Sequence, residues 1–295
     1  MSSAERFALG SLAAGVLVLG LKGAAWWLTG SAALYSDALE SIVNVVASMV
    51  AMAALRFAAR PADANHPYGH DKAEFFAAVI EGVLIVIASL SIFSQAWDAW
   101  RVPHAIEMPF MGIAINGAAT VINLGWSLVL LRAGRRLRSP TLRADGQHLM
   151  SDVVTSVGVG IGVTLAVVTG HLILDPLAAA LTGTYVLWSG MATISRSVSG
   201  LMDEAPEPAV LRRIRDVVAE NAQGAIEAHD LRTRQAGRIM FLEFHLVVPG
   251  AMTVAESHDI CDRIEEALRV EMAHLMVTIH VEPEEKAKQR GVPIL

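Results

Sequence analysis

The chain has a single cysteine, Cys261, among its 295 residues. One cysteine cannot form a disulfide within the chain and cannot supply a cysteine-rich zinc site. Charged residues are also scarce, at 18%, whereas 54% of the residues are hydrophobic. This hydrophobic fraction is high for a water-soluble protein and ordinary for a membrane protein with a soluble domain.

Two further features are missing from the sequence. The first residues, "MSSAERFALG", lack the shape of a signal peptide, because the apolar run is too long and no small-residue cleavage site ends it. We therefore expect a retained first span. An excess of basic residues is also absent: from Asp203 onward, 17 acidic residues stand against 11 basic ones. An acidic soluble part argues against nucleic acid as a partner and is compatible with divalent cations.

Six apolar runs are long enough to cross a membrane, which takes about 20 residues. They cover residues 7–28, 32–57, 75–97, 108–131, 148–168 and 177–194. We predict an all-α membrane domain of six transmembrane helices over residues 1–201. Lys and Arg concentrate between spans two and three and between spans four and five. By the positive-inside rule these connections are cytoplasmic, and six spans then place both termini in the cytoplasm.

Residues 202–295 follow a different pattern. "PEPAVLRRIRDVVAEN" and "TVAESHDICDRIEEALRVEM" predict amphipathic helices, whereas "AIEAHDLRTRQAG", "RIMFLEFHLVVPG" and "LMVTIHVEP" predict strands. The order helix, strand, strand, helix, strand predicts a small α+β domain. Strand alternation places His245 on the polar face of one strand, and His280 and Glu282 together on the polar face of another. These side chains either meet at a metal or are separate surface residues.

Pairs of polar side chains interrupt two of the apolar runs. His148 and Asp152 are four residues apart in span five, and Glu40 and Asn44 have the same spacing in span two. Each pair therefore lies on one helix face. An ionisable residue inside a membrane costs roughly 2.5–3.5 kcal/mol on insertion scales, so a functional role is the first hypothesis. The four side chains suit a four-coordinate divalent ion with nitrogen and oxygen donors. The alternative is a polar contact between helices.

Three more charges lie within the spans. Asp37 precedes Glu40 by three residues. It is either an accessory group near the metal, a step on the exit route, a proton carrier or a carboxylate at a helix N-terminus. Lys22 and Glu81 are single charges in other spans. We expect them to pair with each other or to reach the membrane interface.

Several stretches, in order, resemble one family. "LRADGQH" followed by "HLMSD" resembles the fifth span of the cation diffusion facilitators, and "GSAALYSDALESIVNVVAS" resembles their second. "RPADANHPYGHDKAE" is similar to the next loop in the bacterial zinc and ferrous-iron efflux branch. "HDLRTRQAG" looks like the start of that branch's cytoplasmic domain. The resemblance covers nearly the whole chain.

The resemblance implies a homodimer with a ferredoxin-like cytoplasmic domain over residues 202–295, in the inner membrane of a bacterium. It implies that divalent metal leaves the cytoplasm in exchange for protons. The family's transport site falls on Glu40, Asn44, His148 and Asp152. Close relatives commonly have two aspartates, or a histidine and an aspartate, in span two. Glu40 adds a methylene group, and Asn44 removes a negative charge.

The resemblance also implies further sites. Asp63, His66 and His70 would form a second metal site in the loop after span two, where Pro and Gly exclude a helix; the alternative is a solvated loop. His229 and His258 would join His245, His280 and Glu282 in a metal site that bridges the dimer. Lys72 and Asp203 would form a charge interlock where the two halves of the dimer hinge.

We therefore expect proton-coupled efflux of a divalent metal by alternating access. Zinc is the expected substrate, and iron, cadmium, cobalt and manganese also suit the donors. Since an imidazole in water has a pKa of about 6.5, protons would compete with metal for His148. The alternatives are a membrane metal sensor without transport and an intramembrane metal hydrolase, which would need a general base and an open coordination position.

Overall fold

The computed structural model describes residues 3–102, 105–136, 140–237, 239–288 and 292–293. The chain divides into two compact units. The first consists of Met1–Arg56 and Phe76–Arg196, and the second of Phe57–Phe75 and Ser197–Leu295. The loop between the second and third long helices thus belongs to the same unit as the C-terminal part. The domain boundary at residue 201 stays a prediction.

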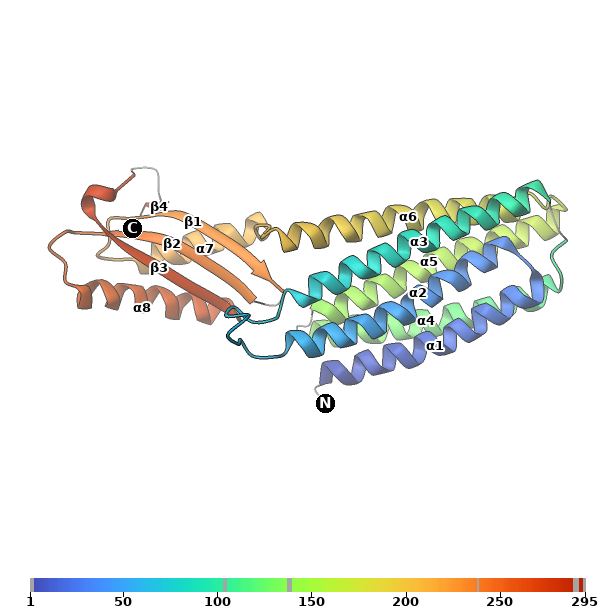
Figure 1. Ribbon diagram of the computed structural model, residues 1–295, viewed down its shortest axis with the longest axis horizontal. Coiled ribbons are helices and arrows are strands. Elements are labelled where there is room, and N and C mark those ends of the chain that lie inside the picture. Colours follow the sequence, from blue (N-terminus) through green and yellow to red (C-terminus); the bar gives the residue numbers. More distant parts are fainter. Residues whose placement is uncertain (1–2, 103–104, 137–139, 238, 289–291, 294–295) are drawn as a thin grey trace. The chain divides into compact units, whose positions relative to one another are not determined.

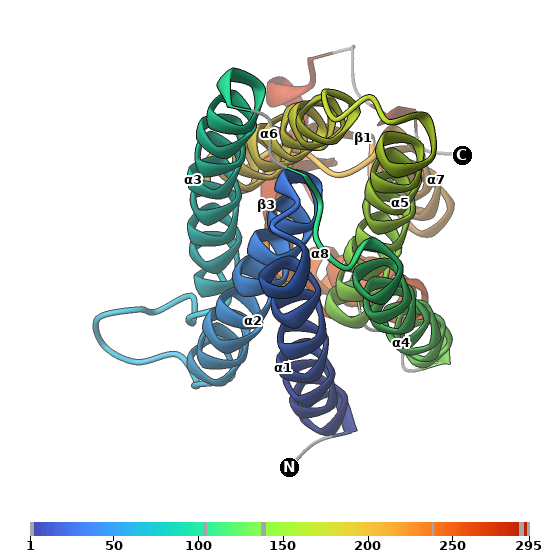
Figure 2. The same ribbon diagram turned by 90° about the vertical axis from the view of Figure 1, so that its right-hand side faces the viewer.

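Six long helices lie alongside one another as a bundle (Figures 1 and 2). They are α1 (Ser3–Thr29), α2 (Ala32–Ala58), α3 (Ala73–Arg101), α4 (Pro109–Arg136), α5 (Pro140–Thr169) and α6 (Leu174–Leu201). All six are long and apolar enough to cross a membrane, so the predicted helix number is confirmed. A chain in a bilayer must satisfy its backbone polar groups within each segment, which is why these runs form helices.

The helices extend beyond the apolar runs that predict them. Arg135 and Arg136 lie in the last turn of α4 and not in a loop. Residues 137–139, which include Arg138 of the predicted basic connection, lie outside the described residues. Hydropathy locates the apolar part of a helix, and the polar turns at its ends follow from local helix propensity instead.

Helices α3 and α6 pack closely at small residues. A Cβ atom on Gly190 would lie 2.8 Å from Cγ2 of Ile85, and one on Gly82 would lie 3.1 Å from the carbonyl oxygen of Gly190. Only glycine permits this approach of the two backbones, as is common between membrane helices. The contact fixes Ile85 next to α6, where it helps to line the cavity described below.

The C-terminal domain has the predicted α+β order (Figure 1). Its elements are α7 (Pro208–Asn221), β1 (Glu227–Ala236), β2 (Ile239–Val248), α8 (Val254–Glu271), β3 (Leu275–Pro283), the 3₁₀ turn η1 (Glu284–Lys286) and β4 (Val292–Pro293). The sheet order is β3–β2–β1–β4. Strand β2 is antiparallel to β1 and parallel to β3, with α8 as the crossover.

Alternation along β2 separates an apolar face from a polar one. Leu242, Phe244 and Leu246 are buried in a core with residues of α7 and α8. Glu243 is exposed and His245 is half-buried on the opposite face. The hydrophobic core therefore holds the two helices on one face of the sheet, and the other face presents the histidines.

Candidate functional site

The four predicted transport-site residues line one small cavity in the bundle: Glu40 and Asn44 of α2, and His148 and Asp152 of α5. The amide of Asn44 connects two of them. Its Nδ2 donates a hydrogen bond to Oδ2 of Asp152, and its Oδ1 accepts one from Nε2 of His148 at 2.9 Å. Glu40 accepts a hydrogen bond from the Thr155 hydroxyl at 3.1 Å. The i, i+4 pairs of two helices thus face each other.

The cavity is tight, and its lining is completed by apolar side chains and by the hydroxyl groups of Ser151, Tyr185 and Ser189. Its volume is about 10 Å³, close to the space that one water molecule needs. Side chains of α3 and α6, among them Ile85, Ala88 and Val186, close the side opposite the four polar groups. Asp152 is 1% exposed, and its Oδ1 has no hydrogen-bond partner among the described residues. A cation that entered would exchange its hydration shell for these nitrogen and oxygen donors.

Lys22 and Asp37 form a buried ion pair beside the cavity. Nζ of Lys22 lies 2.7 Å from Oδ1 of Asp37, and the two side chains are 1% and 0% exposed. Ser156 accepts a hydrogen bond from Lys22 and donates one to Asp37, each at 2.7 Å. The prediction that Lys22 pairs with Glu81 or reaches the interface is therefore wrong. Asp37 lies beyond the first turn of α2, so it is no N-terminal carboxylate.

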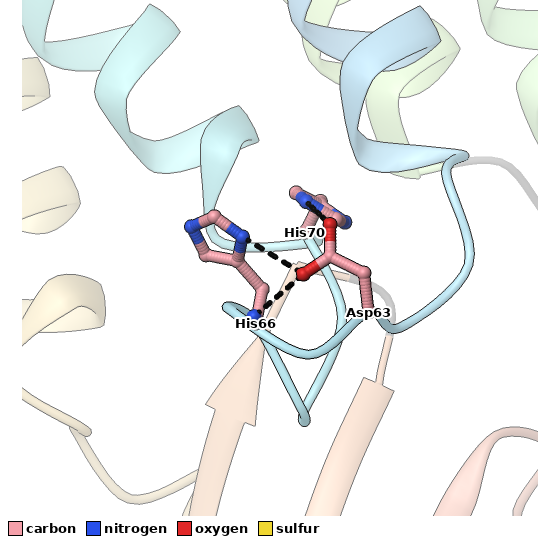
Figure 3. Close-up of side chains that lie close together, drawn as sticks. All are labelled: Asp63, His66 and His70. Atoms are coloured by element: carbon pink, nitrogen blue, oxygen red, sulfur yellow. Dashed lines mark hydrogen bonds and ion pairs between the residues drawn. The ribbon is translucent and has the colours of Figure 1, made fainter.

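The loop after α2 brings Asp63, His66 and His70 together (Figure 3). Nδ1 of His66 lies 3.3 Å from one carboxylate oxygen of Asp63, and Nε2 of His70 lies 3.5 Å from the other. His70 is buried, and its Nδ1 has no hydrogen-bond partner among the described residues. One oxygen and two imidazoles suit zinc and related ions.

A turn in this loop orients the carboxylate of Asp63. The backbone N–H of Asn65 and that of His66 both donate to Oδ1, at 2.9 and 2.7 Å. These hydrogen bonds hold the pKa of Asp63 below its usual value, and the one from the backbone N–H of His66 has the largest effect. The carboxylate therefore stays ionised well below neutral pH, which keeps it ready to bind a cation.

Three histidines form a row across the sheet of the C-terminal domain. His229 of β1 pairs with His245 of β2, which in turn pairs with His280 of β3. The ring centroids are 5.3 and 4.9 Å apart. Glu282 reaches all three, with Oε2 3.3 Å from His229 and Oε1 3.2 Å from His245 and 3.8 Å from His280. His229 is buried, and neither ring nitrogen has a hydrogen-bond partner in the described part.

Two residues differ from the sequence expectation for this row. Asp230 presents a carboxylate oxygen within 4.8 Å of ligand atoms on His229 and His245. Regular strand alternation would turn it away, but the register shifts here and Asp230 has φ of 53°. A hydrogen bond from Lys288 holds the pKa of Asp230 below its usual value. His258 stands apart: it lies on α8, exposed, 3.6 Å from Asp262.

Lys72 and Asp203 form the expected ion pair in the second unit. Nζ of Lys72 lies 2.9 Å from Oδ1 of Asp203. The sequence did not identify Arg234, whose guanidinium lies 4.0 Å from the same oxygen and stacks on the rings of Tyr68 and Phe241. Arg234 thus holds the loop that carries Asp63, His66 and His70 against the sheet. Exposed ion pairs contribute only about 0–1 kcal/mol each, so this group positions the loop more than it stabilises the fold.

Comparison with known families matches almost the whole chain. Residues 8–202 match the cation efflux transmembrane domain, and residues 206–284 match the cytoplasmic domain of cation efflux proteins. Together the two matches cover both the bundle that holds Glu40 and Asp152 and the sheet that holds the histidine row.

Individual relatives agree with these matches. An uncharacterized transporter of Synechocystis sp. is 44% identical over 97% of this chain and 92% of its own length. The cation-efflux pump FieF of Yersinia pestis is 31% identical over 94% of this chain and 91% of its own. A zinc-form structure of CzrB is 49% identical over 29% of this chain and 98% of its own, with a TM-score of 0.28. The chain belongs to the cation efflux family, the cation diffusion facilitators.

Proposed function

We propose that this protein exports divalent metal ions, with Zn²⁺ as the principal substrate, in exchange for protons. The ion binds in the membrane to Glu40, Asn44, His148 and Asp152. It then leaves on the other side as the helices rock between two orientations. The family supplies the coarser statement, that the chain is a cation efflux transporter. The single observation that supports the proposed metal site is the convergence of these four side chains on one buried cavity.

The donor set supports both the metal and the counter-ion. One imidazole, two carboxylates and an amide oxygen suit a borderline ion such as Zn²⁺, and no thiolate lies in the cavity to favour softer metals. Metal ligands must be deprotonated, so protons and metal compete for the same groups. That competition is a sufficient basis for antiport, because the more acidic side releases the metal.

The other sites have supporting roles in this proposal. The protein works as a homodimer in the inner membrane with both termini in the cytoplasm, where the Asp63 loop and the histidine row sample cytoplasmic metal. Metal at the row tightens the dimer. The Lys72–Asp203 pair, 2.9 Å apart, holds the loop in place at the hinge.

Metal flux into proteoliposomes tests the function directly. Zn²⁺, Fe²⁺, Cd²⁺, Co²⁺ and Mn²⁺ are each presented to vesicles with an acidic interior, and internal metal and pH are followed by fluorescence. We expect Zn²⁺ uptake together with alkalinisation of the interior, both absent from protein-free vesicles. A folded, dimeric protein that binds Zn²⁺ without flux would instead be a metal sensor.

Removal of the histidine row should affect regulation and not the transport step. In the variant His245→Ala/His280→Ala, we expect the dependence of flux on metal concentration to shift, because two ligands of the domain site are lost. The maximal flux should stay within about threefold of wild type, since the four membrane ligands are unchanged. His258→Ala is the matched comparison outside the row. Complete loss of flux in a folded double variant would contradict a purely regulatory role.

A further inference from the structure

The buried pair Lys22–Asp37 has a role that the proposed function does not explain. Both side chains are fully buried, in α1 and α2, and Ser156 of α5 bonds to both at 2.7 Å. A membrane span tolerates such charges at a cost, so their presence at this place calls for a reason. Within the helix bundle, this is the one lysine among the fully buried residues that the structure describes.

Both hydrogen-bond partners of Lys22 lie one helical turn from a candidate metal ligand. Asp37 precedes Glu40 by three residues in α2, and Ser156 follows Asp152 by four in α5. The hydrogen bonds of Lys22 to Asp37 and Ser156, each 2.7 Å, hold its ammonium next to the helix turns that carry Glu40 and Asp152. Lys22 is therefore within electrostatic reach of both anionic ligands, although it does not line the cavity.

The charges in this region balance a divalent ion. When the ligands are deprotonated, Asp37, Glu40 and Asp152 bring three negative charges and Lys22 one positive charge, which leaves a net charge of −2. Asp175, the remaining buried carboxylate of the described helices, lies at the start of α6, where it accepts hydrogen bonds from the N-terminal amides of α2. Glu81 and Asp145 are half-buried and do not line the cavity, and the count covers only the buried charges next to it. Without Lys22, the same region would have a net charge of −3.

We propose that Lys22 is a specificity-determining residue of the transport site, because it cancels the charge of Asp37 and so matches the site to a divalent cation. The Ser156 hydroxyl, which bonds to both groups, holds Asp37 against Lys22. This role rests on the proposed function, since it concerns the same site. It predicts that loss of Lys22 strengthens metal binding and slows metal release.

Zn²⁺ flux and Zn²⁺ binding in three variants test this role. In Lys22→Met, an uncompensated charge about one turn from the ion should lower the KM for Zn²⁺ and reduce the maximal flux at least ~10-fold. Lys22→Met/Asp37→Asn restores the net charge of −2, and its flux should return to within about threefold of wild type. Asp37→Asn alone leaves −1 and should raise KM, which gives an independent test if Lys22→Met does not fold.

Failure of the charge-matching role can be told apart from failure of the proposed function. A folded Lys22→Met protein with unchanged or raised KM, a double variant no better than the single one, or an Asp37→Asn protein with unchanged or lowered KM overturns the charge-matching role. Calorimetric titration of the detergent-purified proteins with Zn²⁺ must follow the same order of affinities. If wild-type vesicles take up no Zn²⁺ at all, the proposed function fails instead, whatever the Lys22 variants bind.

Discussion

Replacement of Asp152 by asparagine is expected to abolish metal transport. Asp152 is the most deeply buried of the four candidate ligands, and one of its carboxylate oxygens has no other partner in the described part of the chain. Asparagine keeps the size and the contact to α2 but removes a negative charge from the ion's first coordination sphere. Loss of an outer partner alone typically costs 10–100-fold in metal affinity, so we expect Zn²⁺ flux to fall at least ~100-fold.

Asp98→Asn provides the matched control for this variant. Asp98 is an exposed acidic residue near the end of α3, and it does not line the ligand cavity. Its flux should equal that of wild type. Both proteins are compared by size-exclusion chromatography, so that a folding defect is separated from a transport defect. Undiminished flux in folded, dimeric Asp152→Asn would show that this carboxylate is no metal ligand.

The number of membrane helices, and which polar residues share a helix face, could be predicted from local sequence patterns. Apolar runs identify spans because the bilayer forces every such run into a helix. A spacing of four residues then places His148 with Asp152, and Glu40 with Asn44, on single faces. The same reasoning applies to β2, whose alternation separates Leu242 from His245. These features depend on neighbours within one helix or strand, and the structure agrees with each of them.

Contacts between distant segments could not be predicted in the same way. Lys22 and Asp37 are 15 residues apart, and Ser156 is 134 residues from Lys22, so their meeting depends on the packing of three helices. The periodicity of a single helix does not indicate which buried charge on another helix it will face. Asp230 was missed for a different reason: a shift in strand register reverses the expected direction of its side chain. The contacts of Arg234 were missed because they form only when the loop after α2 packs on the sheet.

Substitution of Asn44 by aspartate is expected to change metal affinity and metal preference together. Asn44 donates a hydrogen bond to Asp152 and accepts one from His148, so an uncharged amide connects the two candidate ligands of α5. Aspartate cannot donate, and it places a third carboxylate at the cavity. Two unit charges 4 Å apart interact by roughly 4 kcal/mol at an effective dielectric constant of 20. Even after the cost of burying the new charge, we expect Zn²⁺ to bind about 10–100-fold more tightly.

Tighter binding should slow transport, because the ion must also leave the site. The maximal flux of Asn44→Asp should therefore fall while its KM falls too, and Mn²⁺ and Fe²⁺, which favour oxygen donors, should gain relative to Zn²⁺ in a panel of divalent metals. Asn44→Asp/Glu40→Gln returns the charge to its original value and should recover the wild-type KM within about threefold. An unchanged metal ranking in Asn44→Asp would show that the amide does not set selectivity.

Asn44→Asp and Lys22→Met each make the net charge of the site one unit more negative. The first change is in contact with the ion, and the second is a helical turn away. If charge balance governs release, both must lower KM, and Asn44→Asp must lower it more.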